Sequence, residues 1–299
     1  MRLYTVEKDG KRIVCAGFAG SEGLWPVKEC FGIDADCMLD IVCCEEKQAQ
    51  LAKFETKPEG EAPFTLADVK LCAPIPNPVG DVVCLGVNYY AHLLESNKVG
   101  HTPLSQKGHT VYFAKRVNEA TPCGGIIPSH RDICDRLDYE VELGVVIGKT
   151  AARVAREDAL DHVFGYTIIN DISARNIQEI HLQWYFGKSL DGACPMGPCI
   201  VTAAEYGDPS GHDICSIVNG ELRQNSTTEL MMQDVPGLIA ELTAGMTLKA
   251  GTVIATGTPA GVAMGMDEPK WLPPGDGGEC KIEGIGSLIN TIGDYRRGL

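Results

Sequence analysis

Three acidic residues are the strongest chemical signal in this chain. Glu140 and Glu142 lie two positions apart in the segment 138–147, in which apolar residues occupy the alternate positions. Because successive side chains of a strand point to opposite faces, both carboxylates should project from the same face. Two like charges roughly 7 Å apart repel each other unless a cation or hydrogen bonds compensate them. With Asp171 as a third ligand we predict a metal site, although this spacing alone is more typical of an exposed polar strand face.

Composition describes an ordinary globular protein with excess negative charge. The 299 residues are 44% hydrophobic and carry a formal net charge of −14, which suits one large domain or a large and a small one. The negative charge argues against nucleic acid or an anionic membrane surface as a partner. No apolar run approaches the roughly 18 residues of a membrane-spanning helix, and the first residues resemble a strand more than a signal peptide. We therefore expect a cytoplasmic protein.

The thirteen cysteines follow no known site pattern. They are scattered from Cys15 to Cys280 without a C-x-x-C pair, so the spacing of a zinc or iron–sulfur site is missing. We expect reduced and mostly buried thiols in a reducing compartment. A nucleophilic cysteine has no support in the sequence.

Three familiar catalytic signatures also fail. The run Gly187-Lys188-Ser189 ends like a P-loop, but Leu182 stands where that motif requires a glycine. The run Gly284-Ile285-Gly286 lacks the third glycine of a dinucleotide fingerprint, and no serine lies in a G-x-S-x-G elbow. Kinase, dehydrogenase and serine hydrolase functions are therefore disfavoured.

Turn signals divide the chain into a small N-terminal part and a larger part rich in strands. Asp9-Gly10 separates two strand-like segments and predicts a hairpin. A proline-rich connector at 74–78 leads us to predict a small domain at 1–75 and a second domain at 76–299. Short strands broken by glycine and proline predict an α+β, mainly β fold. The helices that we expect in the second domain are 156–163, 174–183 and 230–244.

Five segments occur in an order that resembles the fumarylacetoacetate hydrolase superfamily, in particular its bacterial acylpyruvases and 2-hydroxyhepta-2,4-diene-1,7-dioate isomerases. The resemblance extends from about residue 80 to the C-terminus. It implies a mixed β-sandwich roll core with a small N-terminal α/β domain, a small-molecule substrate and a homodimer. The segments are 86–95, 138–147, 170–178, 187–191 and 257–262.

The resemblance also implies a metal and a catalytic pair. It assigns Glu140, Glu142 and Asp171 to Mg²⁺ or Mn²⁺, and three hard carboxylate oxygens suit such an ion. It assigns His92 and Glu95 to a dyad on a short lid helix, where residues three apart are neighbours and the carboxylate can raise the basicity of the imidazole. Without the resemblance, such a pair would be interpreted as an exposed surface pair with no catalytic role.

Further roles follow from the same resemblance. Gln178 and Lys188 correspond to an amide and an ammonium group that stabilise developing negative charge. The backbone N–H and hydroxyl of the Gly257-Thr258 loop would hold a substrate carboxylate. Arg175 would brace the site through an ion pair, and it joins Tyr89 among the substrate-binding residues.

The sequence departs from the family pattern in one segment that shapes the substrate end of the pocket. Many relatives have a proline after a lysine, whereas this chain has Phe113-Ala114-Lys115-Arg116. The identity of the substrate is therefore the least determined property.

These observations predict a metal-dependent hydrolase that cleaves a C–C bond in an acylpyruvate-like or 2,4-dioxo acid and yields pyruvate or a related 2-oxo acid. His92 with Glu95 would activate water, and Lys188 with Gln178 would stabilise the oxyanion. The alternative is a decarboxylase or a tautomerase of a β-keto or 2-oxo acid such as oxaloacetate, because these reactions pass through the same enolate. A catalytically silent, metal-stabilised binding protein is disfavoured because all four residues are present.

Overall fold

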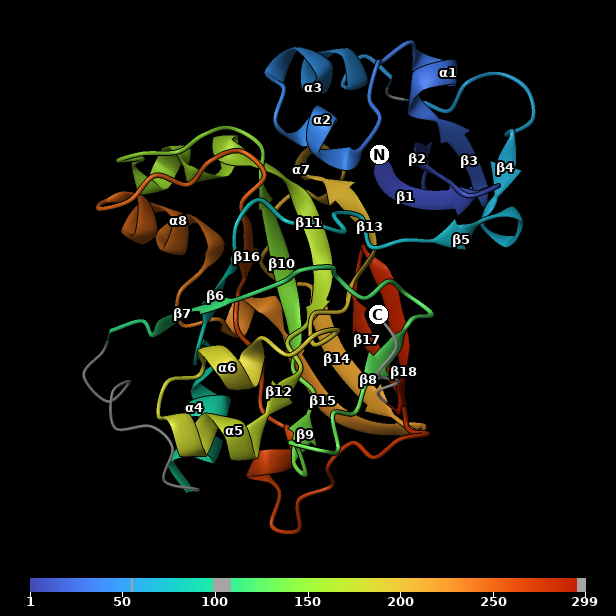
Figure 1. Ribbon diagram of the computed structural model, residues 1–299. Helices are drawn as coiled ribbons and strands as arrows, with labels where there is room; N and C mark the ends of the chain where they lie inside the picture. Colours follow the sequence, from blue (N-terminus) through green and yellow to red (C-terminus); the bar gives the residue numbers. More distant parts are fainter. Residues whose placement is uncertain (55, 99–108, 295–299) are drawn as a thin grey trace.

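The protein is a mixed α+β structure made mainly of strands, as the sequence predicted. The computed structural model describes residues 1–54, 56–98 and 109–294 (Figure 1). One large sheet runs through the molecule and continues into the N-terminal part, and a smaller sheet packs beside it. Within the described residues no helix is long and apolar enough to cross a membrane.

The large sheet has 11 strands and contains the strand that bears Glu142. Its strands in spatial order are β4 (Phe64–Thr65), β3 (Gly23–Pro26), β2 (Lys11–Gly17), β1 (Arg2–Lys8), β13 (Met196–Thr202), β11 (Val163–Asn170), β10 (Val141–Ile147), β16 (Val253–Ala255), β6 (Val82–Leu85) and β7 (Tyr112–Lys115), while β5 (Lys70–Leu71) pairs with β1. β10 lies in the interior of this sheet, between β11 and β16.

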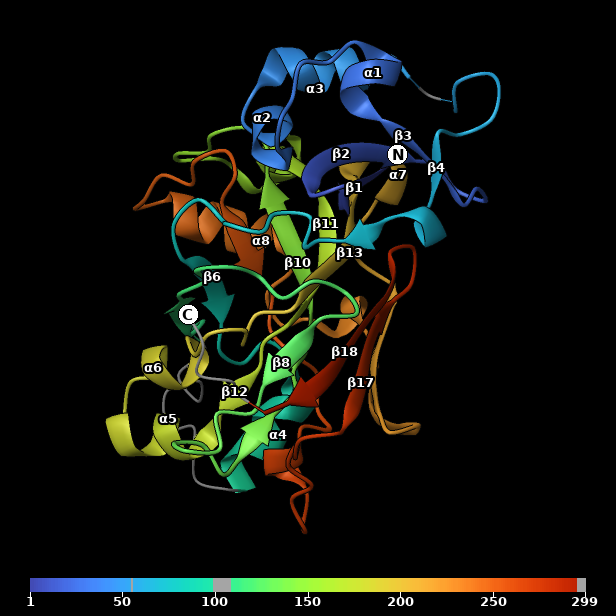
Figure 2. The same ribbon diagram turned by 45° about the vertical axis from the view of Figure 1, so that its right-hand side comes forward.

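A 5-stranded sheet packs against the large one, and a separate 2-stranded ribbon directly precedes β10 and α5 (Arg175–His181) in the chain. The five strands are β15 (Glu221–Thr227), β14 (Asp213–Val218), β17 (Gly277–Ile282), β18 (Gly286–Gly293) and β8 (Ile126–Pro128); the ribbon joins β12 (Ser173–Ala174) to β9 (Leu137–Asp138). Leu143 of β10 shares one buried core with Ile214 and Ile282 of the smaller sheet. Figure 2 shows β8, β18 and β17 side by side in front of the large sheet.

The helices are short; two groups of three lie at opposite ends of the molecule, and α8 (Val235–Thr243) lies at its side (Figure 1). Those of the N-terminal part are α1 (Val27–Phe31), α2 (Met38–Val42), α3 (Glu45–Leu51) and the 3₁₀ turn η1 (Leu66–Asp68). The others are α4 (Tyr90–Lys98), η3 (Arg156–His162), α5 (Arg175–His181), α6 (Tyr185–Lys188), α7 (Ala203–Tyr206), η4 (Thr228–Leu230), α8 (Val235–Thr243) and η5 (Ala263–Gly265). In Figure 1, α4, α5 and α6 lie together at the end of the molecule opposite to α1, α2 and α3.

The N-terminal hairpin forms where the sequence predicted it. β1 and β2 pair antiparallel from Arg2↔Gly17 to Lys8↔Lys11, and both turn residues, Asp9 and Gly10, have positive φ values of 50° and 75°, as a type I′ turn requires. β1 also pairs with β13, so the N-terminal part shares a sheet with the remainder of the chain. The domain boundary at residue 75 stays a prediction.

One local expectation was wrong. Helix α8 begins at Val235 rather than near residue 230, because Pro236 fits only the first turn of a helix and the Asp234 carboxylate caps that turn by accepting from the Gly237 N–H. For β10 the structure adds that all seven residues are buried, because Val146 on the second face packs into another apolar core.

All thirteen cysteines are free thiols, as expected. Seven are buried, and six, among them Cys37 and Cys43 at the surface, are exposed or partly exposed. The prediction of mostly buried thiols therefore holds for a narrow majority.

The tight packing of β11 against β13 gives a test of the large sheet. A Cβ atom added to Gly165 would lie 2.3 Å from the Val201 carbonyl oxygen, and backbone cannot move away cheaply. We expect Gly165→Ala to lower the free energy of unfolding by about 1–3 kcal/mol, measured by urea denaturation. Gly245→Ala is the control, since a Cβ there meets no atom within 4 Å; equal losses in both variants would contradict the packing argument.

Candidate active site

Backbone pairing brings the three acidic residues together. Val141 of β10 lies opposite Asn170 of β11, so the start of one strand meets the end of the other. The Asp171 N–H donates to the Glu140 carbonyl at 2.8 Å, and the Glu140 N–H donates to the Asn170 side chain at 3.0 Å. One carboxylate oxygen from each of Glu140, Glu142 and Asp171 lies within 4.8 Å of the others, and all three residues are buried.

Three cations compensate this buried negative charge. The Lys188 ammonium donates to both Glu140 and Asp171 at 2.5 Å. The Lys115 ammonium lies 2.7 Å from the second oxygen of Asp171, and the Arg175 guanidinium donates to Glu140 at 2.5 Å. Every one of these side chains is buried. Three cations thus face the three carboxylates, and Arg175 also pairs with a fourth buried carboxylate, that of Asp138.

The pKa values of the two glutamates shift in opposite directions. Burial acts to raise the pKa of Glu140, but Arg175 and Lys188 outweigh it and lower that pKa to about 2. Burial, together with the charges of Asp171 and Glu140, raises the pKa of Glu142 well above its usual range. The Glu142 carboxylate accepts one hydrogen bond, from the Gly257 N–H at 2.8 Å. A divalent cation held by these residues would favour the charged form of Glu142.

The residues present fit a hard divalent metal ion. All three candidate ligands are carboxylates, and their oxygens converge in a buried position. Mg²⁺ and Mn²⁺ prefer such oxygen ligands, and fewer than six protein ligands leave positions for a substrate or water. Lys188 already bonds to one oxygen of Glu140 and one of Asp171, so it would lie beside an ion held by these residues.

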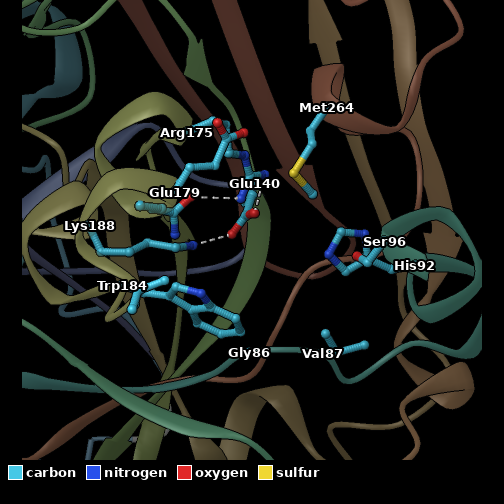
Figure 3. A pocket seen from close by; sticks show the side chains of 12 residues that line it. Gly86, Val87, His92, Ser96, Glu140, Arg175, Glu179, Trp184, Lys188 and Met264 are labelled. Carbon is cyan, nitrogen blue, oxygen red and sulfur yellow. Dashed lines mark hydrogen bonds and ion pairs between the residues drawn. The ribbon is translucent and has the colours of Figure 1, made fainter. Parts of the chain in front are cut away.

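The predicted dyad forms on α4. His92 Nδ1 lies 3.0 Å from Glu95 Oε2, at the spacing of neighbours on one helix face. The Gly261 N–H donates to both oxygens of Glu95, at 3.1 and 3.3 Å, and so fixes the carboxylate from the other side. The imidazole is only 3% exposed. In Figure 3 it faces the cavity, on the side opposite Glu140 and Lys188.

A cavity of about 280 Å³ lies between the dyad and the charged cluster (Figure 3). Charged and polar side chains form one part of its wall, and apolar side chains form another. The lining residues are Gly86, Val87, His92, Ser96, Glu140, Arg175, Gln178, Glu179, Leu182, Trp184, Lys188 and Met264. Of the three acidic residues only Glu140 lines the cavity, and Glu142 and Asp171 lie behind it. A small molecule in the cavity can therefore contact Glu140, Arg175 and Lys188 on one side and His92 on the other.

Besides the dyad, four residues that the sequence predicted as catalytic or substrate-binding differ in whether they line the cavity. Gln178 lines the cavity, and its amide oxygen accepts from Arg175 at 3.3 Å. Gly257 and Thr258 are absent from the lining: the Gly257 N–H is bonded to Glu142, and the Thr258 hydroxyl donates to a β10 carbonyl at 2.9 Å. Tyr89 is also outside the lining and is 2% exposed. Substrate contacts of these last three residues stay predictions.

Sequence reasoning missed several residues of the site. Lys115 is the lysine of the segment in which this chain lacks the family's following proline, and that segment was its signal. Asp138 begins the segment of the two glutamates, yet its carboxylate bonds to Arg175 and to the backbone N–H groups of Ala263 and Met264, which no local pattern shows. Trp184 and Met264 line the cavity from segments far apart in the chain, and no local pattern marks them.

Comparison with known proteins identifies the family. Residues 81–293 match the family model described as fumarylacetoacetate (FAA) hydrolase C-terminal. The chain belongs to the fumarylacetoacetate hydrolase family. This membership confirms the resemblance and the enzyme class predicted from the sequence, and the buried carboxylate triad agrees with the divalent metal expected for it.

Three relatives place the chain more closely within the fumarylacetoacetate hydrolase family. The oxaloacetate tautomerase YisK of Bacillus subtilis (strain 168) is 45% identical over 247 residues, which cover 82% of this chain and 81% of the relative. The structure of fumarylacetoacetate hydrolase from Exiguobacterium antarcticum is 37% identical with a TM-score of 0.83, covering 99% of this chain and 100% of that chain. Maleylpyruvate hydrolase from Sphingobium sp. SYK-6, in complex with manganese(II) ion and pyruvate, is 28% identical with a TM-score of 0.77 and the same coverage. These likenesses confirm the predicted fold type.

The raised pKa of Glu142 makes Glu142→Gln a test of the metal site. Loss of one ligand should weaken Mg²⁺ or Mn²⁺ binding by more than the roughly 10–100-fold that is typical of changes outside the ligand sphere, as measured by calorimetry. A raised folded pKa stabilises the protein below the unfolded pKa of about 4.3, and this contribution is lost as pH rises through the folded pKa. Without metal, the thermal stability of the wild type should therefore fall as pH rises through the raised pKa of Glu142. The thermal stability of metal-free Glu142→Gln should not show this fall.

Glu283→Gln is the control for this change, because Glu283 is exposed and far along the chain from the three ligands. It should alter neither metal affinity nor the pH dependence of unfolding. Unchanged metal affinity in Glu142→Gln would show that the three carboxylates do not form the metal site.

Proposed function

We propose that this protein is a divalent-metal-dependent tautomerase that interconverts the enol and keto forms of a small 2-oxo acid of the oxaloacetate type. The relative that is 45% identical is an oxaloacetate tautomerase, and the alignment includes most of both chains. This supports the alternative from the sequence better than the hydrolase that the sequence led us to prefer. Decarboxylation has no comparable support among these relatives.

The observation that carries the proposal is the position of His92. Its imidazole is buried, held by Glu95, and faces the cavity across from the carboxylate triad. A 2-oxo acid bound at the triad would extend its third carbon toward this ring. Tautomerisation needs one group that removes a proton from that carbon and returns it, and a buried imidazole is suited to that task near neutral pH.

The metal and the dyad have separate tasks in this reaction. When bound, a divalent cation would polarise the carbonyl oxygen and stabilise the negative charge that develops on it. His92 takes the proton from carbon, which leaves an enolate, and the imidazolium or a water returns a proton to the enolate oxygen to give the enol. In the reverse direction the oxygen loses its proton and the imidazolium protonates the carbon. Glu95 fixes the orientation of the ring through its contact with Nδ1, which leaves Nε2 for the proton transfer.

Lys188 and Gln178 support the polar end of the substrate. The ammonium group of Lys188 has three N–H donors, of which two are bonded to Glu140 and Asp171. The Gln178 amide oxygen is bonded to Arg175, which leaves its amide nitrogen to donate to a ligand. Both residues line the cavity and are suited to stabilise an oxyanion.

Hydrolysis of a C–C bond is the second candidate. The structural neighbour that holds manganese(II) and pyruvate is a maleylpyruvate hydrolase, and the same dyad could activate a water in place of a carbon acid. The identity to this neighbour is 28%, against 45% to the tautomerase, so tautomerisation is the better supported function.

A two-substrate assay separates the candidates. Purified protein with Mg²⁺ or Mn²⁺ is mixed with the enol form of oxaloacetate, and the loss of enol absorbance is compared with the uncatalysed rate. In parallel, acylpyruvates and ring-cleavage dioxo acids are analysed for pyruvate release. Fast enol loss without pyruvate release supports the tautomerase; pyruvate release from a dioxo acid without accelerated enol loss would replace it with the hydrolase.

The role of His92 leads to a direct kinetic prediction. We expect His92→Ala to lower kcat for enol loss by about 10²-fold or more, as loss of a general base does, while metal affinity stays close to that of the wild type. His162→Ala is the matched control, because His162 bonds to the Lys149 carbonyl in another part of the fold. A His92→Ala variant with the kcat of the wild type would refute the proton-transfer role.

A further inference from the structure

A buried aspartate that is not a candidate metal ligand lies between the charged cluster and the lid helix. Asp138 is 0% exposed and belongs to β9, just before the strand of the two glutamates. Its Oδ1 accepts the N–H groups of Tyr139 at 2.9 Å and Ala263 at 2.8 Å. Its Oδ2 accepts the N–H of Met264 at 3.1 Å and the Arg175 Nε–H at 2.9 Å, and Arg175 Nη2 forms an ion pair with the same oxygen at 2.9 Å. This buried carboxylate therefore links the Arg175 side chain to the backbone of Ala263 and Met264.

The first connection leads to the metal carboxylates. Arg175 contacts Asp138 through Nε and Nη2, and the same Nη2 donates to Glu140 Oε1. The guanidinium is planar and has a fixed fork of donors, so fixing one edge orients the whole group. With Oε1 occupied by Arg175, Glu140 Oε2 is left beside Asp171, as their shared bond to Lys188 shows. Asp138 therefore aims Glu140 by way of Arg175.

The second connection leads to the catalytic dyad. Ala263 and Met264, which Asp138 holds, belong to the segment 261–265 that receives the lid helix. The Gly261 N–H donates to Glu95, and a Cβ added to Gly265 would lie only 1.9 Å from Glu95 Cγ. The glutamate side chain thus packs directly on the backbone of this segment. Its docking, and with it the position of the His92 ring, depends on the conformation that Asp138 fixes.

We propose that Asp138 is a positioning residue that couples occupancy of the metal site to docking of the lid helix α4. A metal ion that orders Glu140 also orders Arg175 and Asp138, which hold the segment against which Glu95 docks. The coupling acts in both directions, because a ligand that favours the docked lid must bind more tightly when the lid is docked. The base would then be in place chiefly when the metal site is filled. The inference concerns the linkage itself and holds for either candidate reaction.

Hydrogen exchange tests the direction from metal to lid. In the wild type, saturating Mg²⁺ should slow amide exchange in α4 by about 5-fold or more, the lower end of typical couplings. In Asp138→Asn the amide nitrogen would face the donors of Arg175 and Met264 and cannot accept from them. Metal should then bind more weakly, and at saturation it should no longer slow exchange in α4. The same metal affinity and the same exchange response as in the wild type would overturn the proposal.

Metal calorimetry tests the reverse direction without altering the charged cluster. Gly265→Ala should displace the Glu95 side chain, since the added Cβ contacts only side-chain atoms of that residue at under 2.5 Å. We expect this variant to bind Mg²⁺ about 5-fold or more weakly in the wild-type background and to have no further effect in Asp138→Asn. Unchanged metal affinity in Gly265→Ala would overturn the coupling, even if Asp138→Asn fails to fold.

The control is Glu205→Gln, which removes another carboxylate that holds an arginine. Glu205 accepts from Arg2 at 3.1 Å on the N-terminal strand, away from the cavity. This variant should lower thermal stability while leaving metal affinity and the exchange response of α4 unchanged. If it reproduced the effects of Asp138→Asn, those effects would reflect general destabilisation, and the positioning role would be rejected.

Discussion

The structure depends on the burial of three carboxylates within a few ångströms of one another. Burial of one ionised group is costly, and a second like charge raises that cost. The protein compensates with Lys115, Lys188 and Arg175, each of which is itself buried and requires the carboxylates as partners. Removal of any member would leave an uncompensated charge in a low dielectric. The compensation of charge therefore depends on the cluster as a whole. A divalent cation would supply part of the positive charge that the carboxylates require.

The two sheets make this cluster possible. β10 lies between β11 and β16, and apolar cores cover both of its faces. Water is thus excluded from the triad except through the cavity, and electrostatic interactions there are stronger than at a surface. The metal end of the site is built on sheet backbone, whereas the base stands on a short helix that docks through Glu95. The cavity lies between these two parts of the site.

This division of the site explains why one fold can serve several reactions on related compounds. The proposed tautomerase and the second candidate, a hydrolase, both require a 2-oxo acid bound at the carboxylates and a base beside its carbon chain. They differ in whether the base acts on the carbon chain or on a water. Trp184, Met264 and Val87 belong to the apolar part of the lining and shape the space in which a substrate would lie.

The sequence by itself determined the features that are local. The hairpin at Asp9-Gly10, the common face of Glu140 and Glu142, and the spacing of the dyad follow from backbone geometry within a few residues. The family resemblance then supplied their chemistry. Only the tertiary structure decided that both faces of β10 are buried, that Lys115 belongs to the charged cluster, and that Asp138 meets the segment near Gly261. These contacts join residues dozens to more than one hundred positions apart, and their formation depends on how the sheets pack, which no local pattern encodes.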